Sequence, residues 1–202
     1  MSVLALDLSS TCTGWSLYTK DGKLLDKGRI VPDKKIDSLS KIHYVVNKIK
    51  ELYNKADELV IEDIYLGSFG NVDMLKYLAR LSGAVVYTWI DYKYKMPKFY
   101  MAVVARKLVG QKGNAHKAEI QVFILNKYNF ATKEMIDKYD DMIAEIKSQH
   151  EAKAIKKGAY KYQMDKISSL IDEETEIGED VADSMVLGLA YCEDNKHEKK
   201  DN

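Results

Sequence analysis

Apolar runs separated by short turns open the chain and predict the first strands of a sheet. Residues 3–8, 14–19 and 23–31 each have the length and composition of a strand. Asp21-Gly22, between the last two runs, is typical of a two-residue hairpin turn. These three strands are therefore expected to form an antiparallel meander at the start of the chain.

Helical and strand patterns then alternate. Apolar residues recur at helical spacing from Leu39 to Leu52, which predicts an amphipathic helix over residues 38–55. The apolar run at residues 58–64 predicts a buried strand that lies parallel to the first strand, because a helix separates the two. Residues 99–104 predict one more strand. Together these segments predict an α/β fold with a mixed five-stranded sheet flanked by helices.

Three further helices are predicted over residues 73–91, 115–128 and 178–192. Asp73 is expected to cap the first of them. Apolar positions run nearly all round this helix, which fits either a fully buried helix or one with surface left for a second copy of the chain.

The composition changes to charged helix formers from residue 133 onward. We interpret residues 133–170 as a helical hairpin inserted before the last helix, with its turn at residues 156–162. The insertion projects from a single domain over residues 1–194, and residues 195–202 are expected to form a polar tail.

Charge is balanced over the 202 residues but unevenly distributed. The chain has 31 Lys and Arg residues and 31 Asp and Glu residues. Residues 92–117 contain seven cations and no acid, whereas residues 172–183 contain seven acids and no cation. This segregation predicts an anion-binding face beside a cation-binding site.

Cysteine usage and hydropathy limit the cellular context. Cys12 and Cys192 are too few for a disulfide framework or a thiolate zinc site, which favours a reducing compartment. The apolar stretch at residues 81–90 is too short to cross a bilayer, and Asp7 interrupts the only apolar run that could belong to a secretion signal. We expect a soluble cytoplasmic protein with no membrane partner.

Four acidic residues lie in segments that otherwise look like core. Asp7 and Glu62 stand in apolar strand-like runs, and Asp180 and Asp183 are separated by three positions at the start of the last helix. Buried carboxylates cost free energy unless a cation or hydrogen bonds compensate them. If the first and fourth strands are neighbours, all four can converge. Oxygen ligands favour Mg²⁺ or Mn²⁺ over zinc, and a cluster that holds two such ions suits phosphodiester hydrolysis.

Each acid has a simpler explanation when it is taken alone. Asp180 and Asp183 could stabilise the helix dipole, and Asp7 could cap the turn that follows it. Glu62 could end a strand at the surface, with Asp63 beside it as a competing ligand. These explanations would have to hold independently of one another, so a shared metal site is the more economical hypothesis.

The segments that carry the acids resemble a known family. Residues 5–16, 60–63, 105–117 and 179–184 fall in the order and spacing of RuvC-type Holliday junction resolvases, which have the ribonuclease H-like fold. The resemblance covers most of the chain. Leu8-Ser9-Ser10 after Asp7, and the long segment before Asp180, are more similar to the phage and poxvirus branches than to bacterial members.

The resemblance implies a metal-dependent endodeoxyribonuclease that resolves four-way junctions by paired nicks, leaving 5′-phosphate and 3′-hydroxyl ends. Asp7, Glu62, Asp180 and Asp183 would bind two Mg²⁺ ions, for which Mn²⁺ could substitute, and Lys117 would meet the scissile phosphate. A phage member would act in the cytoplasm of its bacterial host.

The resemblance also implies DNA contacts and a homodimer. Tyr65 takes the place of an aromatic residue that stacks on junction bases, and the helix at residues 73–91 matches the family's dimer helix. The DNA contacts would be Tyr65, Phe69, Arg106, Lys107, Lys112, His116 and Lys117. The dimer contacts would be Leu78, Leu81 and Val85.

Other interpretations remain open. Lys156-Lys157-Gly158, followed by Tyr160 and Tyr162, could contact an adjacent arm of a branched substrate, although a solvated surface is the simpler interpretation. A branched-DNA-binding protein without catalysis would be expected to lack part of the acid set. A relative of the actin-like ATPases and kinases would need a second phosphate-binding loop and a second lobe.

Overall fold

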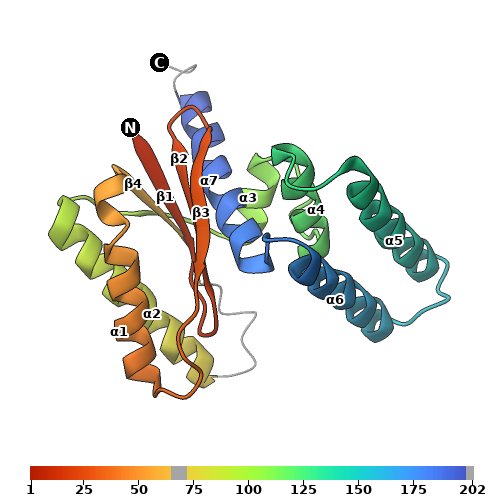
Figure 1. Ribbon diagram of the computed structural model, residues 1–202, viewed down its shortest axis with the longest axis horizontal. Coiled ribbons are helices and arrows are strands. Elements are labelled where there is room, and N and C mark those ends of the chain that lie inside the picture. Colours follow the sequence, from red (N-terminus) through yellow and green to blue (C-terminus); the bar gives the residue numbers. More distant parts are fainter. Residues whose placement is uncertain (65–71, 199–202) are drawn as a thin grey trace.

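The computed structural model describes residues 1–64 and 72–198 and has a five-stranded sheet at its centre (Figure 1). The sheet order is β3-β2-β1-β4-β5. β1, β2 and β3 are antiparallel, whereas β4 lies parallel to β1 and β5 lies parallel to β4. The predicted mixed sheet and α/β class are confirmed. The strands are β1 (Ser2–Asp7), β2 (Thr13–Thr19), β3 (Leu24–Ile30), β4 (Glu58–Glu62) and β5 (Lys98–Tyr100).

Helices cover both faces of this sheet. α1 and α2 pack on one face, and α7 crosses the other, where it contacts β1, β2 and α3 (Figure 1). None of the helices in the described ranges is both long and apolar enough to cross a membrane. The helices are α1 (Ser38–Lys50), α2 (Val72–Lys93), α3 (Ala102–Leu108), α4 (Lys117–Tyr128), α5 (Lys133–Glu151), α6 (Lys157–Glu174) and α7 (Glu179–Glu198).

The alternation of side chains along β1 decides which residues face α7. Leu4 and Leu6 are buried in the core beneath α1 and α2, whereas Val3 and Ala5 are buried in the core beneath α7. Successive side chains of a strand point to opposite faces, so Asp7 belongs to the α7 face. The strand therefore ends with a carboxylate directed at the helix that carries the other acids.

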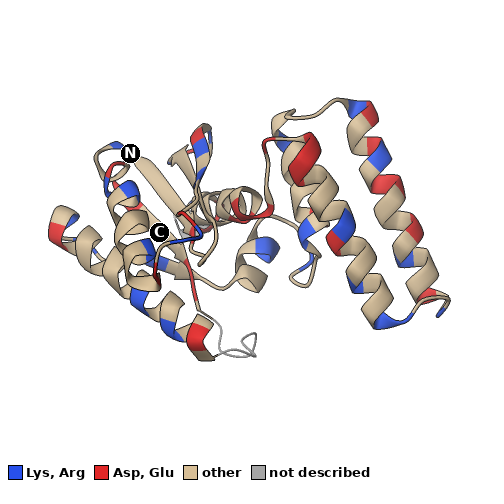
Figure 2. Cartoon of the chain, turned by 60° about the horizontal axis from the view of Figure 1, so that its bottom comes forward, with Lys and Arg blue, Asp and Glu red and all other residues tan. Residues whose placement is uncertain are grey.

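The helical hairpin predicted before the last helix is present as α5 and α6. The two helices lie side by side and, with α4, extend away from the sheet (Figures 1 and 2). Charged residues follow both helices, whereas the sheet is largely uncharged (Figure 2). Their apolar stripes are buried in the same core as α7. The buried residues are Ile136, Tyr139, Ile143, Met164, Ile167 and Ile171.

Two boundaries near β5 and α6 were predicted wrongly. Residues 99–104 were expected to be a strand, but β5 ends at Tyr100 and α3 begins at Ala102. The β-branched Val103 and Val104 misled the strand prediction, because tertiary packing of the next residue, Ala105, against the α7 core decides for a helix. The expected turn around Lys156-Lys157 lies just earlier, and Lys157 already begins α6.

Two helix ends were also misplaced. The first helix ends at Lys50, and residues 53–55 form a separate short turn of 3₁₀ helix. The last helix was expected to end near Cys192, before a polar tail, yet α7 continues to Glu198. No glycine or proline interrupts residues 189–198, so charged helix formers extend the helix beyond its buried part.

Two of the three predicted dimer contacts, Leu81 and Val85, lie inside the chain's own core. Leu81 and Val85 are fully buried in the chain's own core between α1, α2 and the sheet, and Leu78 is partly buried there. Residues that fill this core cannot also cover a second copy of the chain. The outward face of α2 carries Arg80 and Tyr87 instead, and the Tyr87 side chain is 70% exposed.

Candidate active site

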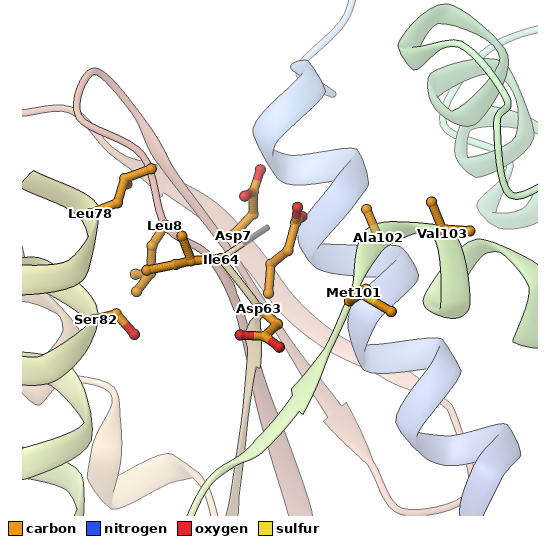
Figure 3. Close-up of a pocket in the computed structure, with 10 residues that line it drawn as sticks. Asp7, Leu8, Asp63, Ile64, Leu78, Ser82, Met101, Ala102 and Val103 are labelled. Atoms are coloured by element: carbon orange, nitrogen blue, oxygen red, sulfur yellow. The ribbon is translucent and has the colours of Figure 1, made fainter. Parts of the chain in front are cut away.

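Asp7 and Glu62 end neighbouring parallel strands at the same level. The register pairs Leu6 of β1 with Ile61 of β4, so the next residues along both strands, Asp7 and Glu62, lie side by side on the α7 face. Asp7 points toward α7, whereas Asp63 points away from it (Figure 3). Because side chains alternate between the two faces along β4, Glu62 faces the acid site and Asp63, the competing ligand in the sequence, does not.

The first turns of α7 bring Asp180 and Asp183 to the same end of the sheet. Gly14 of β2 approaches this helix so closely that a Cβ atom there would lie 1.9 Å from the carbonyl oxygen of Asp180. The Ser16 hydroxyl donates a hydrogen bond of 2.8 Å to the carbonyl oxygen of Ser184. Gly14 and Ser16 of β2 thus fix the position of α7 along the strands, and with it the positions of Asp180 and Asp183.

The acids interact strongly with one another. Burial, followed by Glu62, Asp183 and Asp180, holds the pKa of Asp7 well above its ordinary value. Burial and the Asp183 carboxylate raise the pKa of Glu62 to about 7. Burial raises the pKa of Asp180 to about 6, against an opposing hydrogen bond from Cys12. The chain has therefore gathered negative charge that it only partly compensates.

Arg106 of α3 compensates one of the acids from within the chain. Its Nη2 atom lies 3.1 Å from Oδ1 of Asp183, and both side chains are almost buried, with exposures of 13% and 12%. Its Nη1 atom donates a hydrogen bond of 2.9 Å to the carbonyl oxygen of Ala115. The guanidinium is thus held between the loop before α4 and the acid cluster.

Lys117, the first residue of α4, is the second cation beside the acids. Its Nζ atom lies 2.8 Å from Oε1 of Glu179, and its charge lowers the pKa of Asp7 and of Glu62. Burial alone would lower the pKa of Lys117 itself, but the surrounding carboxylates, Glu179 first, raise it. Lys117 therefore stays protonated at neutral pH next to the acids.

Comparison with known proteins identifies this arrangement. Residues 3–147 match the family model described as crossover junction endodeoxyribonuclease RuvC. The chain belongs to the RuvC family. The matched segment includes Asp7, Glu62 and Lys117, but it ends within α5 and does not reach Asp180 or Asp183.

Individual relatives agree with this assignment. The crossover junction endodeoxyribonuclease RuvC of Ehrlichia chaffeensis is 32% identical over 130 residues, which cover 61% of this chain and 80% of the relative. The Acinetobacter baumannii enzyme of the same name is 22% identical over 160 residues, covering 77% and 86%. The Thermus thermophilus RuvC structure has a TM-score of 0.61 at 12% identity and covers 98% of this chain and 97% of its own. A second structure, titled T. thermophilus RuvC in complex with Holliday junction substrate, has a TM-score of 0.58 at 10% identity, covering 98% and 96%. Both structures share the fold, which confirms the predicted ribonuclease H-like architecture.

The RuvC family depends on metal ions, and the donor set here fits hard divalent cations. Four carboxylates from β1, β4 and α7 offer oxygen ligands only, and the raised pKa values of Asp7, Glu62 and Asp180 indicate negative charge in excess of the nearby cations. In residues 1–64 and 72–198, no three His, Cys, Asp or Glu side chains already stand close enough to hold one ion. Metal binding is therefore expected to draw the carboxylates together and to displace cations such as Arg106.

The raised pKa values give the metal-free protein an unusual dependence on pH. The pKa of Glu62 rises from 4.5 to about 7 on folding, which corresponds to about 3 kcal/mol. Because the folded state holds this proton more tightly than the unfolded state, the contribution is complete below pH 4.5 and is lost as the pH rises through 7. In EDTA, urea unfolding is expected to show lower stability at pH 8.5 than at pH 5.5.

Two comparisons test this origin of the pH dependence. The Glu62→Gln variant carries no charge at this position, so its stability is expected to fall much less over the same pH range. Millimolar Mg²⁺ is expected to restore stability at pH 8.5, because ligands that bind only the folded state stabilise it. A wild-type protein equally stable at both pH values in EDTA would contradict the shift.

A cavity of about 500 Å³ opens beside Asp7 and Glu62 (Figure 3). Its walls are mostly apolar and come from the ends of β1 and β4, from α2, and from the β5–α3 connection. Leu78 and Ser82 line it from α2, and Met101 from the opposite side. The acids thus stand at the edge of a space large enough for part of a polymeric substrate.

The other predicted DNA-binding residues do not all join the acids. Tyr65 and Phe69 lie outside the described residues. Lys107 and Lys112 are exposed but do not line the cavity beside the acids, and Lys112 lines a separate, smaller cavity with Lys147 and Tyr160. The structure gives His116 a different role, because its Nδ1 accepts a hydrogen bond from the backbone of α4 and its Nε2 lies 3.1 Å from Asp165 of α6.

The cations of residues 92–117, which we call the central basic segment, are less available to a ligand than the sequence indicates. Four of the seven cations at residues 92–117 pair with acids of this chain in the described structure: Lys95 with Glu58, Lys98 with Asp194, Arg106 with Asp183, and Lys117 with Glu179. These ion pairs leave fewer cations available for the anion-binding face that the sequence predicts over this segment.

Sequence reasoning missed three residues of the site. Glu179 pairs with Lys117, and Cys12 hydrogen-bonds Asp180, whose charge together with burial raises the thiol pKa to about 12. Gly14 permits the close approach of α7. Glu179 directly precedes Asp180 in the sequence and could have been included, whereas Cys12 and Gly14 had no signal apart from their place in the first turn.

Proposed function

We propose that this protein is a metal-dependent endodeoxyribonuclease that cuts four-way DNA junctions and other branched DNA by paired nicks. The observation that carries the proposal is that Asp7, Glu62, Asp180 and Asp183, from three elements, lie near enough for the other three carboxylates to raise the pKa of Asp7, with Lys117 beside them. The family name, and the Thermus relative captured with a Holliday junction substrate, support the choice of DNA substrate.

The chain's own residues would divide the work of phosphodiester hydrolysis. The four carboxylates would hold two Mg²⁺ ions, or Mn²⁺ in their place. Such ions activate water and stabilise the leaving 3′ oxygen, which yields 5′-phosphate and 3′-hydroxyl ends. Lys117, which stays protonated, would neutralise charge that develops on the scissile phosphate. Buried Arg106 would keep Asp183 compensated until substrate and metal arrive.

A four-way junction offers two equivalent strands, and one chain has one acid cluster. We therefore propose a homodimer, because a twofold pair of identical chains places two sites on a symmetric substrate. The exposed side of α2 is the proposed contact. Tyr87 supplies apolar surface there, and the open space beside Gly83 permits close approach of a second helix.

The decisive experiment uses a synthetic four-way junction labelled on each strand in turn. With 10 mM Mg²⁺, the protein is expected to nick two strands of like polarity symmetrically, and excess EDTA is expected to abolish the nicks. Ligation of the products by DNA ligase without prior treatment tests for 5′-phosphate and 3′-hydroxyl ends. A linear duplex of the same sequence is the matched control substrate.

Two other outcomes would favour the competing functions. A gel shift of the junction without any nick in Mg²⁺ or Mn²⁺ would indicate a binding protein without catalysis. ATP turnover independent of DNA would indicate an actin-like ATPase. Either result would overturn the proposed nuclease activity.

A further inference from the structure

The turn that joins α5 to α6 carries a concentration of free positive charge. Between residues 152 and 162 there are four lysines and no acid. All four side chains are exposed, and within the described residues none of them forms an ion pair. We call these residues the hairpin tip: Lys153, Lys156, Lys157 and Lys161.

The hairpin tip differs in this respect from the basic segment at residues 92–117. In that segment, four of the seven cations form ion pairs with acids of the same chain, Asp183 and Glu179 among them. The hairpin tip keeps its lysines for solvent or for a ligand. It also lies beyond residue 147, where the match to the RuvC family model ends, so the family assignment says nothing about its role.

The base of the hairpin is fixed to the nuclease core by buried polar contacts. Gln121 of α4 donates hydrogen bonds to Asp172 at 2.6 Å and to the carbonyl oxygen of Ile177 at 3.2 Å, and it accepts one from Ser168 of α6 at 2.6 Å. His116, next to Lys117 of the acid site, pairs with Asp165 of α6. The hairpin is thus a rigid extension of the element that carries Lys117.

The turn itself is also held in one conformation. The rings of His150 and Tyr160 stack with centroids 4.6 Å apart, which joins the end of α5 to the start of α6. Lys153 has a left-handed backbone with φ of 56°, and its amide donates to the carbonyl oxygen of His150. A preorganised turn presents its lysines at defined positions, which lowers the entropic cost of binding.

The hairpin tip lies toward the end of the sheet at which the acid-bearing elements meet. Asp7 and Glu62 are the last residues of β1 and β4, and Asp180 lies in the first turn of α7. In Figure 1, β1 and β4 run downward, and the α5–α6 connection lies in the lower half of the same view. Helix α5 has 19 residues and is about 28 Å long, so the turn stands well away from the sheet. A branched DNA bound at the acids extends duplex arms outward at this end of the sheet.

The lysines occupy the end of α6 where positive charge is least favourable. The N-cap residue, Lys156, makes no side-chain capping bond, and the first turn contains no acid. The dipole of a helix disfavours cations at its N-terminus, so this arrangement costs stability in the free protein. An anion placed there would offset that cost.

We propose that the hairpin tip binds the phosphate backbone of a duplex arm of the DNA substrate, outside the acid site. The proposal rests on the proposed function for the presence of branched DNA. Backbone contacts of this kind add affinity and orientation without reading sequence. An acidic protein would also complement the charge, but DNA is favoured because the hairpin tip lies toward the end of the sheet that carries the acid site.

The test measures binding of a four-way junction and of a linear duplex by fluorescence anisotropy in Ca²⁺, over a range of salt concentrations. The double variant Lys156→Ala/Lys157→Ala is expected to bind about tenfold more weakly at 0.1 M salt and to lower the salt slope by about 2. Its cleavage rate at saturating protein in Mg²⁺ is expected to equal that of the wild type. The matched control is Lys20→Ala/Lys23→Ala, which removes two lysines at the opposite end of the sheet and is expected to leave the slope unchanged (Figure 1).

A charge-reversed variant separates lost binding from lost folding. Lys156→Glu/Lys157→Glu is expected to weaken DNA binding further, yet its melting temperature should equal or exceed that of the wild type, because acids suit the start of a helix. A salt slope equal to that of the wild type in both variants would overturn the proposal, as would equal losses in the control. If the wild type binds DNA without cutting it, the proposed function fails while the slopes still decide the role of the hairpin tip. If it binds no DNA at all, both fail.

Discussion

Replacing Asp7 by asparagine is expected to lower the rate of junction cleavage by about 10³-fold or more. Bound metal ions contribute several kcal/mol to stabilising the transition state, and each 1.4 kcal/mol corresponds to a factor of ten in rate. Asp7 is the carboxylate on which Glu62, Asp183 and Asp180 all act, so it stands at the centre of the cluster. The neutral amide of the asparagine that replaces it cannot supply the negative charge that would hold the metal ions.

The same substitution is expected to stabilise the metal-free protein. Burial and three neighbouring carboxylates disfavour the charge on Asp7, and asparagine removes that charge with little change in shape. Thermal unfolding in EDTA should therefore show a higher melting temperature for Asp7→Asn than for the wild type. Junction binding in Ca²⁺ should persist. Loss of activity together with gained stability is characteristic of an active-site residue rather than a structural one.

Asp63→Asn is the matched control for this prediction. Asp63 directly follows Glu62, but its side chain is exposed and points away from Asp7 (Figure 3). Its replacement removes the same charge a short distance away and is expected to leave the cleavage rate within a factor of about three, or about 0.6 kcal/mol. Equal losses in both variants would mean that local charge, and not ligation by Asp7, supports cleavage.

The acid site was predictable from sequence because strands repeat with a period of two. Because Val3 and Ala5 face α7, Asp7 two residues later must face α7 too. The parallel register places Glu62 of β4 next to Asp7, so Glu62 faces the same helix. The three-residue spacing of Asp180 and Asp183 similarly puts both on one side of α7. The sequence therefore predicted the four acids as one group and predicted the mixed sheet, whereas the register that sets Glu62 beside Asp7 comes from the structure.

Features that depend on packing between distant segments were not predictable in the same way. The apolar character of α2 did not reveal that Leu81 and Val85 face the chain's own core. The charge of the central basic segment did not reveal that Lys95 and Lys98 pair with acids more than thirty residues away. Pairing of this kind is set by tertiary structure, and a local count of charges cannot detect it.

The distribution of cations explains how the protein tolerates its acid cluster before metal binds. Arg106 faces Asp183 and Lys117 faces Glu179, while Asp7 and Glu62 have raised pKa values that favour their protonated forms. The free protein thus reduces its buried negative charge by ion pairs and by bound protons. Metal ions compete with both, so metal affinity is expected to rise with pH.

Arg106→Ala is expected to cost about 3–5 kcal/mol of folding free energy in EDTA, measured by urea denaturation at pH 8. Removing one partner of a buried ion pair leaves the other charge without compensation, and this loss is larger than the net gain from forming the pair. The side chains of Arg106 and Asp183 are only 13% and 12% exposed, so we treat the pair as a buried ion pair. The carbonyl oxygen of Ala115 also loses its donor. Mg²⁺ is expected to recover part of the loss, because it can replace the guanidinium as the counterion.

A double-mutant cycle with Asp183→Asn separates charge from packing. If the loss in Arg106→Ala comes from the abandoned Asp183 carboxylate, the double variant Arg106→Ala/Asp183→Asn should regain most of the lost stability in EDTA. It should also lose the response to Mg²⁺, since one of the four acids is gone. A double variant no more stable than Arg106→Ala would instead attribute the loss to the packing of the arginine stem. The cycle thus tests whether Arg106 stands in for metal at Asp183, which the geometry of the pair indicates.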